Sequence, residues 1–234
     1  MRRVMVTGGN RGLGLEFVRQ CLARGDLVFA GCRRPENAVD LQALSSAHPG
    51  RLTVLNLDVT DDAAIDASVE VVRSQANGLD LLINNAGAYP RGETPISISA
   101  TTMLRAFHLN SVAPMIVAQR CLDLLKAGDH SKIVNISSKM GSLWWKEKEG
   151  GGDYSYCSSK AALNMLTRTL ALDLRSEGII VVAMNPGWVQ TDMGGIAADL
   201  TPAESVHGML NVIERLTEAD TSKFFTWEGQ EHPW

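Results

Sequence analysis

The segment Arg3-Val4-Met5-Val6-Thr7-Gly8-Gly9-Asn10-Arg11-Gly12-Leu13-Gly14 decides the fold expected of this chain. It starts as a short apolar run, passes through a turn with four glycines, and continues as an amphipathic segment of helical period over Gly14–Arg24. Such a turn can bring backbone N–H groups close to a phosphate at the helix N-terminus. Tight turns also use glycine simply for its positive φ, so the turn alone is a modest signal. The segment predicts a β-α unit with a candidate phosphate site.

The same pattern repeats along the chain. Further apolar runs, each long enough for a buried strand, occupy Leu27–Cys32, Leu52–Leu57, Leu79–Ile83, Lys132–Ser137 and Ile179–Met184. Segments of helical period lie between or after them, over Asp61–Gln75, Thr101–Leu125, Tyr156–Arg175 and Pro202–Leu216. This alternation predicts an α/β fold, with residues 1–234 as a single domain around a doubly wound parallel sheet covered by helices on both faces. Ligands bind such sheets at the carboxyl ends of the strands.

Composition limits the classes of function. The chain has 22 Lys and Arg against 26 Asp and Glu, a net charge of −4, and no basic run that could follow a nucleic-acid backbone. The apolar stretch at the N-terminus is too short for a signal peptide or a membrane span, so we expect a cytoplasmic protein that binds neither membrane nor nucleic acid. The four cysteines and five histidines show no metal-ligand spacing, so we expect no metal.

The end of the second expected strand indicates which dinucleotide would bind. An NAD site usually has an acidic residue there for the ribose 2′-hydroxyl, but this chain has Cys32 followed by Arg33, about 18 residues beyond Gly14. A guanidinium at that place favours a 2′-phosphate, and Arg11 in the glycine turn would add a second positive charge. We therefore expect NADP(H). The alternative is that Arg33 and Arg34 only solvate the end of a strand.

A tyrosine and a lysine have the spacing that proton transfer requires. Tyr156 and Lys160 are four residues apart and share one helical face, so an ammonium next to the phenol would lower its high pKa. An isolated pair of this kind is more often a tyrosine packed over a lysine stem. Upstream, Ser137 and Ser138 end a strand, and one of them could hydrogen-bond a carbonyl oxygen. Asn110, inside an expected helix, would either hold a water, bend the helix, or be an ordinary satisfied polar residue.

Together these residues resemble the short-chain dehydrogenase/reductase family. The resemblance rests on Thr7–Gly14, Asp58, Asn84–Gly87, Asn110, Ser138, Tyr156–Lys160 and Asn185–Gly187, which follow the family order along the whole chain. Through Pro186–Gly195 and the Trp-Glu-Gly sequence at Trp227, it is most similar to the C-factor, sniffer and carbonyl-reductase-like group. Each motif is weak alone, but the ordered set is highly specific.

The resemblance implies a Rossmann-type sheet of about seven strands, the last near Lys223–Trp227, and a catalytic tetrad. In that tetrad Tyr156 is the acid/base, Lys160 tunes it and binds the nicotinamide ribose, Ser138 orients the substrate oxygen, and Asn110 supports a relay water. Ser138 is preferred to Ser137 because the family serine lies three residues before a glycine, here Gly141. The implied cofactor-binding residues, which also include Tyr156 and Lys160, are Gly8, Asn10, Arg11, Gly12, Leu13, Gly14, Arg33, Asp58, Val59, Asn85, Ala86, Gly87, Pro186, Gly187, Val189 and Thr191.

One segment departs from the family pattern. Ser138 and Tyr156 are 18 positions apart, more than is common in the family, and the charged and glycine-rich stretch Lys146–Asp153 between them predicts a mobile loop with a solvated face. Aromatic and apolar residues near the site could wall a substrate pocket, namely Tyr89, Trp144, Trp145, Trp188 and Met193. Equally, one or both of the paired tryptophans could pack against the core or a second subunit.

Three functions follow as hypotheses. The first is an NADPH-dependent carbonyl reductase acting on a small or medium aldehyde or ketone, or the reverse alcohol oxidation. The second is an NADP(H)-binding signalling protein of the C-factor type, in which turnover is incidental. A dehydratase or epimerase of activated sugars would need a further domain, for which too few residues follow Trp188. The helix over Tyr156–Arg175 could join two copies of the chain, although its apolar positions fit core packing equally well.

Overall fold

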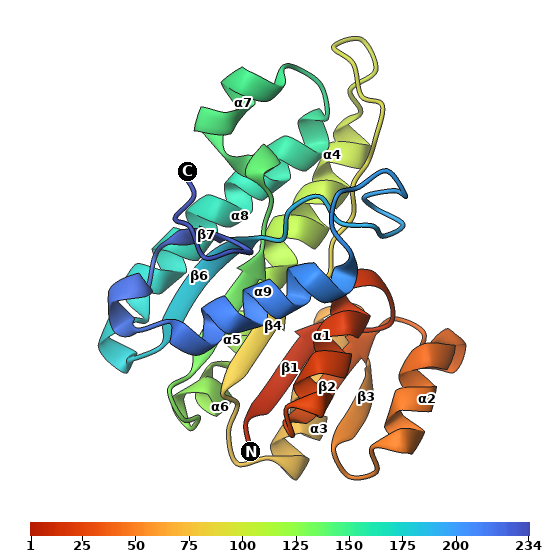
Figure 1. The fold of residues 1–234 in the computed structure, drawn as a ribbon, viewed down its shortest axis with the longest axis vertical. Helices are drawn as coiled ribbons and strands as arrows, with labels where there is room; N and C mark the ends of the chain where they lie inside the picture. Colours follow the sequence, from red (N-terminus) through yellow and green to blue (C-terminus); the bar gives the residue numbers. More distant parts are fainter.

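Seven parallel strands form one sheet, in the order β3-β2-β1-β4-β5-β6-β7, in the computed structural model of the chain (Figure 1). The structure describes residues 1–234, apart from the side chain of Glu149. The strands are β1 (Arg3–Thr7), β2 (Leu27–Cys32), β3 (Leu52–Asn56), β4 (Leu81–Asn84), β5 (Lys132–Ile136), β6 (Ile180–Asn185) and β7 (Phe224–Thr226). The predicted doubly wound parallel sheet is therefore confirmed.

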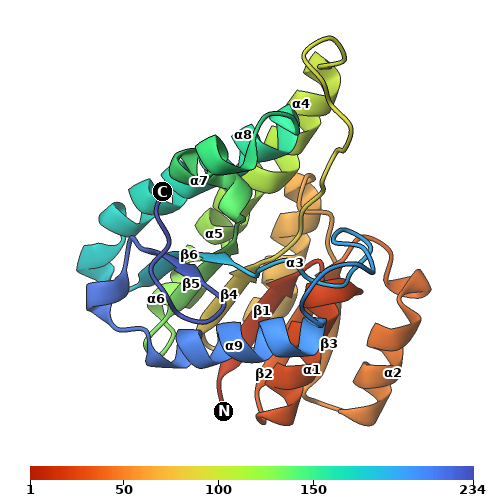
Figure 2. The same cartoon turned by 45° about the horizontal axis from the view of Figure 1, so that its top comes forward.

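Helices cover both faces of this sheet (Figure 2). They are α1 (Gly12–Ala23), α2 (Val39–Ala47), α3 (Asp62–Gln75), α4 (Ala100–Phe107), α5 (Ala113–Arg120), α6 (Leu122–Lys126), α7 (Leu143–Glu149), α8 (Tyr154–Asp173) and α9 (Pro202–Arg215). Helices α1, α2 and α9 pack on one face, and α3, α5, α6 and α8 pack on the other. No helix among the described residues combines the length and the apolar character needed to cross a membrane.

Strand alternation explains why there are two cores. Successive side chains of a strand point to opposite faces of the sheet. In β1, accordingly, Val4 and Val6 join the core under α1 and α9, whereas Met5 joins the core under α3 and α5. All three are fully buried. Because apolar residues occupy both faces, the strands appear in the sequence as continuous apolar runs.

Two sequence predictions of secondary structure were wrong, and one helix was missed. The expected helix over Thr101–Leu125 is divided into α4, a π-helical turn at His108–Val112, α5 and α6. Most of the charged part of the expected loop is helical, because α7 runs to Glu149 before Gly150 ends it with a φ of 85°. Helix α2 was not predicted, since it buries only one residue, Leu41, and has a weak apolar stripe.

The start of α7 has a local cause that the loop prediction overlooked. Ser142 caps the helix, its Oγ accepting a hydrogen bond from the Trp145 N–H at 3.3 Å. Lysine and glutamate, which fill its second half, are good helix formers. Lys146 is not a fully solvated residue either, because its Nζ donates to the carbonyl of Gly152 at 3.2 Å. The extra residues before α8 thus form helix α7 and a short glycine loop.

Candidate active site

The candidate site lies where the strand order reverses, between β1 and β4. From β1 the chain moves outward through β2 and β3, then returns to the other side of β1 with β4. Thr7 joins the two strand ends, because its Oγ1 accepts hydrogen bonds from the N–H groups of Asn85 and Ala86, both at 3.0 Å. The Asn85 side chain donates to the carbonyls of Thr7 at 2.9 Å and Gly8 at 3.2 Å. Open α/β sheets bind ligands in this crevice.

The glycine turn is as tight as the sequence predicted. Gly8 and Gly12 have φ values of 67° and 53°, which other residues rarely adopt. A Cβ on Gly14 would lie 2.0 Å from the Gly8 carbonyl oxygen, so only glycine fits there. The first turn of α1, which includes Leu13, has no side-chain cap and no acidic residue. Asn10 is partly buried in the turn. This helix N-terminus is therefore electrostatically suited to an anion.

Charged side chains follow the neighbouring strands. Burial acts to raise the pKa of Asp58, after β3, but hydrogen bonds from the hydroxyl and amide of Thr60, at 2.7 and 2.9 Å, outweigh it. The charge of Arg33, which is exposed after β2, lowers that pKa further. Val59 is buried beside Asp58. Arg11, expected near a 2′-phosphate, forms an exposed ion pair with Asp192 at 2.9 Å.

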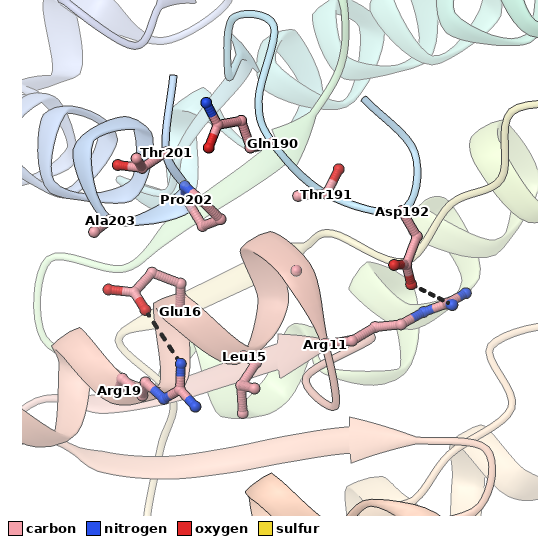
Figure 3. A pocket seen from close by; sticks show the side chains of 11 residues that line it. Arg11, Leu15, Glu16, Arg19, Gln190, Thr191, Asp192, Thr201, Pro202 and Ala203 are labelled. Carbon is pink, nitrogen blue, oxygen red and sulfur yellow. Dashed lines mark hydrogen bonds and ion pairs between the residues drawn. The ribbon is translucent and has the colours of Figure 1, made fainter. Parts of the chain in front are cut away.

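A cavity of about 400 Å³ opens beside the glycine turn, between α1, the start of α9 and the loop after β6 (Figure 3). The ion pair of Arg11 and Asp192 stands at one end of it. Its lining residues are Arg11, Gly12, Leu15, Glu16, Arg19, Gln190, Thr191, Asp192, Thr201, Pro202 and Ala203. None of the four predicted tetrad residues lines this cavity, which adjoins the glycine turn.

The fold brings three of the predicted catalytic residues together, namely Ser138, Tyr156 and Lys160. Tyr156, in the first turn of α8, is 7% exposed and hydrogen-bonds the Ser138 side chain. Lys160, one turn later, is also buried and donates from Nζ to the Ile136 carbonyl at 2.8 Å. Ser137 points elsewhere, since its Oγ donates to Asn164 Oδ1 at 2.5 Å. Of the two serines, Ser138 is therefore the one placed against Tyr156.

The pKa values of this pair differ from the sequence expectation. Burial raises the pKa of Tyr156 to about 12, although the hydrogen bond with Ser138 acts to lower it. Burial also lowers the pKa of Lys160 to about 8. The predicted lowering of the Tyr156 pKa by Lys160 is thus wrong for the protein chain by itself. The physical reason is that the Lys160 Nζ is held at a backbone carbonyl, 5.9 Å from the centre of the tyrosine ring, while desolvation acts on the whole phenol.

Asn110 lies in the π-helical turn, fully buried. Its Oδ1 accepts from the Ala88 N–H and its Nδ2 donates to the Ala88 carbonyl, both at 2.9 Å, and Nδ2 also reaches Ser159 Oγ at 3.0 Å. A Cβ on Gly87 would lie 3.1 Å from Asn110 Oδ1 and 3.8 Å from Lys160 Nζ. Asn110 therefore ties the end of β4 to α8, next to the lysine.

The loop after β6 approaches the glycine turn from the opposite side. Its Pro186 carbonyl accepts from Ser205 Oγ of α9 at 2.7 Å. Gly187 has a φ of 80° and no room for a Cβ beside Leu200. Val189 is buried and pairs with Leu200 as a parallel bridge. A Cβ on Gly12 would lie 3.3 Å from Thr191 Cγ2, so this loop covers the turn.

The expected pocket-wall residues other than Tyr89 occupy two separate places. Trp188 is half exposed, and its Nε1 donates to the Gly194 carbonyl at 2.9 Å in the same loop as Met193. Trp144 is also half exposed and packs edge-on against Trp145, with ring centres 5.1 Å apart. Trp145 packs near His232, with the two ring centres 5.8 Å apart. One of the paired tryptophans therefore packs against the C-terminal segment, as one of the two sequence interpretations allowed.

Several residues that organise the site had no signal in the sequence. Thr7 belongs to the glycine turn, which gives no indication that its side chain joins two strand ends. Asp192 and Ser159 lie within motifs that assign them no role, and Glu93 lies in none of the motifs. Long-range partners such as Glu93 and Ser155, which are 62 residues apart, have no periodic or local pattern that would reveal them.

Comparisons with known proteins identify the family to which this sequence and fold are similar. The sequence profile described as short chain dehydrogenase matches residues 2–200. The C-signal protein of Myxococcus xanthus is 42% identical over 156 residues, covering 67% of this chain and 93% of that protein. An NADPH-bound carbonyl reductase from chicken fatty liver superposes with a TM-score of 0.92 at 42% identity, covering 100% of this chain and 99% of that one. The carbonyl reductase Sniffer of D. melanogaster superposes with a TM-score of 0.94 at 32% identity over the full length of both chains.

Proposed function

Because the chain belongs to the short-chain dehydrogenase family, an oxidoreductase family, we propose that it is an NADPH-dependent carbonyl reductase of aldehydes or ketones. The single observation that carries this proposal is the buried Tyr156, with the Lys160 Nζ 5.9 Å from its ring centre and the Ser138 side chain as a hydrogen-bond partner. A tyrosine and a serine hydroxyl so placed can both serve one carbonyl oxygen. The carbonyl reductases among the similar structures support the same reaction.

The residues around the glycine turn fit NADP(H). Tight backbone at Gly8, Gly12 and Gly14 leaves space for a pyrophosphate at the uncapped start of α1. At the end of β2, Cys32 and Arg33 stand where an NAD site usually has a carboxylate, and the exposed Arg11 would exchange its ion pair with Asp192 for one with the 2′-phosphate. Asp58 and Val59 would flank the adenine, and Asn85 to Gly87 the adjoining ribose. Pro186, Gly187, Val189 and Thr191 would border the nicotinamide and its phosphate.

The chain's own groups supply the proton and its orientation. When bound, NADPH supplies a hydride to the carbonyl carbon. The Ser138 hydroxyl orients the carbonyl oxygen, and the Tyr156 phenol gives that oxygen its proton. A pKa of about 12 keeps Tyr156 protonated at neutral pH, which suits the direction of reduction. Lys160, with a pKa of about 8, is largely an ammonium at neutral pH and would donate to the nicotinamide ribose. Asn110 holds the backbone of Ala88 in place next to Lys160.

A turnover panel tests this proposal. The purified chain is incubated with NADPH or NADH and a range of aldehydes and ketones, and coenzyme oxidation is followed by absorbance. We expect oxidation of NADPH with at least one carbonyl compound and a preference over NADH of roughly tenfold or more, the value of one charge-assisted contact to the 2′-phosphate. Tight NADPH binding without turnover of any carbonyl would overturn the reductase proposal.

The similarity to C-signal favours one second candidate, a signalling protein that binds NADP(H). In that case the cofactor would act as a ligand that stabilises the fold, and the tetrad would contribute little to the biological activity. The two candidates differ in what the Tyr156→Phe variant loses. A reductase loses turnover, whereas a signalling protein keeps its cellular effect and its NADPH affinity.

A further inference from the structure

The helix that carries Tyr156 and Lys160 has an unusual N-terminus. The residue in its N-cap position, Asp153, adopts a left-handed conformation with φ 51°, and its side chain caps none of the helix N–H groups. A non-glycine residue in this conformation is strained and needs compensating contacts. The Asp153 carboxylate instead accepts a hydrogen bond from the Tyr89 hydroxyl at 2.8 Å. The N-cap residue therefore does not cap this helix, and the capping group comes from elsewhere in the chain.

The replacement cap comes from a distant segment, residues 88–93, which follows β4. Glu93 accepts a hydrogen bond from the Ser155 N–H at 2.6 Å and another from the Ser155 hydroxyl at 2.5 Å. Ser155 is the second residue of α8, where an N-cap side chain normally binds. Ser155 is fully buried, so losing Glu93 would leave a buried N–H and hydroxyl without their carboxylate. The carboxylate also complements the positive end of the helix dipole.

The same segment contacts the reacting phenol directly. The ring centres of Tyr89 and Tyr156 are 4.4 Å apart with the planes tilted by 33°, which is close aromatic contact. Tyr89 is anchored by its hydroxyl on Asp153, and the Arg91 guanidinium lies 5.1 Å from its ring centre. Burial raises the pKa of Tyr89, and the hydrogen bond to Asp153 raises it further, so Tyr89 stays protonated and continues to donate.

These contacts support an inference that rests on the proposed function. We propose that residues 88–93 form a positioning segment for the general acid, in which the Tyr89 ring fixes the Tyr156 ring and Glu93 caps the helix that carries it. Tyr89 and Glu93 are positioning residues and transfer no proton. The segment continues directly from Asn85 to Gly87, and Asn110 holds both the N–H and the carbonyl of Ala88. One continuous stretch of backbone therefore carries both Asn85 to Gly87, assigned to the cofactor ribose, and the residues that position the general acid.

Substitutions at Tyr89 test the aromatic contact. Tyr89→Ala should lower kcat for carbonyl reduction about tenfold or more and leave the NADPH Kd within about twofold, since a misplaced acid affects the chemical step. Tyr89→Phe keeps the ring and should keep kcat within about threefold of the wild type. If Tyr89→Ala does not fold, Tyr89→Leu takes its place. A folded Tyr89→Ala or Tyr89→Leu variant with unchanged kcat would overturn the role of Tyr89.

The pH profile separates positioning from general loss of structure. The ionisable or polar groups around Tyr156 are Lys160 and Cys157 on α8, Ser138 after β5, and Arg91 beyond the Tyr89 ring. Removing the Tyr89 ring admits water to the phenol, which reduces the burial that raises its pKa. Tyr156 would then lose its proton at lower pH. The ionisation of Tyr156 is followed by tyrosinate absorbance, as the difference between each protein and its Tyr156→Phe counterpart, because the alkaline limb of kcat would also report Lys160, whose pKa is about 8. That ionisation should shift to lower pH in Tyr89→Ala and return to the wild-type position in Tyr89→Phe. An unshifted ionisation would contradict the proposal.

Amide exchange tests Glu93 without any substrate. In Glu93→Gln the hydrogen–deuterium exchange of the peptide that contains residues 153–160 should become faster, while exchange elsewhere in α8 stays the same. The matched control is Glu70→Gln, an exposed glutamate on α3 whose ion partner is its neighbour Arg73. Unchanged exchange in Glu93→Gln would overturn the capping role. Because this measurement needs no turnover, it stays decisive even if the wild type reduces no carbonyl compound, the outcome that would overturn the proposed function instead.

Discussion

Replacing Gly14 by alanine should destabilise the protein, although the same change inside a helix normally stabilises it. Alanine is favoured over glycine in a helix by about 0.8–1.0 kcal/mol. Here the new methyl group would lie 2.0 Å from the Gly8 carbonyl oxygen and 2.6 Å from Asn85 Nδ2. Both atoms are held, because Asn85 Nδ2 donates to the Gly8 carbonyl itself at 3.2 Å. Contacts this short call for the upper part of the roughly 1–3 kcal/mol that overpacking costs, about 2–3 kcal/mol, which is more than the helix preference returns.

The net loss for Gly14→Ala is therefore expected at about 1–2 kcal/mol, measured by urea unfolding at constant m-value. The displaced turn should also lower NADPH affinity by roughly tenfold or more, followed by the fluorescence of the bound coenzyme. The matched control is Gly151→Ala, because a Cβ there meets no atom within 4 Å. That variant should unfold within about 0.5 kcal/mol of the wild type. The steric reasoning would be refuted if Gly14→Ala were as stable as Gly151→Ala and bound NADPH equally well.

Three further predictions follow from the same geometry. Arg33→Ala should weaken NADPH binding by about tenfold or more and leave NADH binding unchanged, in paired titrations; equal loss for both coenzymes would exclude a 2′-phosphate contact. Ser138→Ala should lower kcat by about tenfold or more without loss of stability. Ser137→Ala removes the hydrogen bond to Asn164, so it should lower the melting temperature and leave kcat nearly unchanged. A loss of kcat in Ser137→Ala but not in Ser138→Ala would show that Ser137 is the active serine. Burial would raise the pKa of Asp80, but its hydrogen bonds with Arg3 and with the Asp129 N–H lower it. Its stabilisation is therefore complete above pH ~4 and is lost as pH falls through the lowered folded-state pKa. Asp80→Asn should cost about 1.5–3 kcal/mol at pH 7 and flatten the acid limb of the stability profile, and an unchanged limb would show that Asp80 does not contribute.

The sequence predicted the sheet because its strands carry their own signal. Each central strand is buried on both faces, so it appears as an uninterrupted apolar run such as Ile180 to Met184. The glycine turn was equally readable, because a positive φ or a missing Cβ restricts a position to one residue type. By contrast α2, which buries only Leu41, has almost no apolar stripe to detect.

The site was only partly predictable, because its residues were identified one motif at a time and their mutual contacts were not. Tyr156, Lys160 and Ser138 were assigned from spacing and family resemblance, and the structure places them together. The raised pKa of Tyr156 was missed, since burial cannot be read from a four-residue spacing. The π-helical turn at Asn110 and the cap from Glu93 depend on side chains packed from distant parts of the chain. Such tertiary contacts override local propensity.

The role of Tyr156 as the general acid is tested most directly by comparing Tyr156→Phe with Tyr154→Phe, two identical changes two residues apart in α8. In both variants NADPH affinity and carbonyl turnover are measured together. Tyr156→Phe should bind NADPH as the wild type does and lose turnover by about 10²-fold or more, because the proton donor is gone, while Tyr154→Phe keeps both properties. Turnover in Tyr156→Phe close to that of Tyr154→Phe would contradict the assignment of Tyr156 as the proton donor.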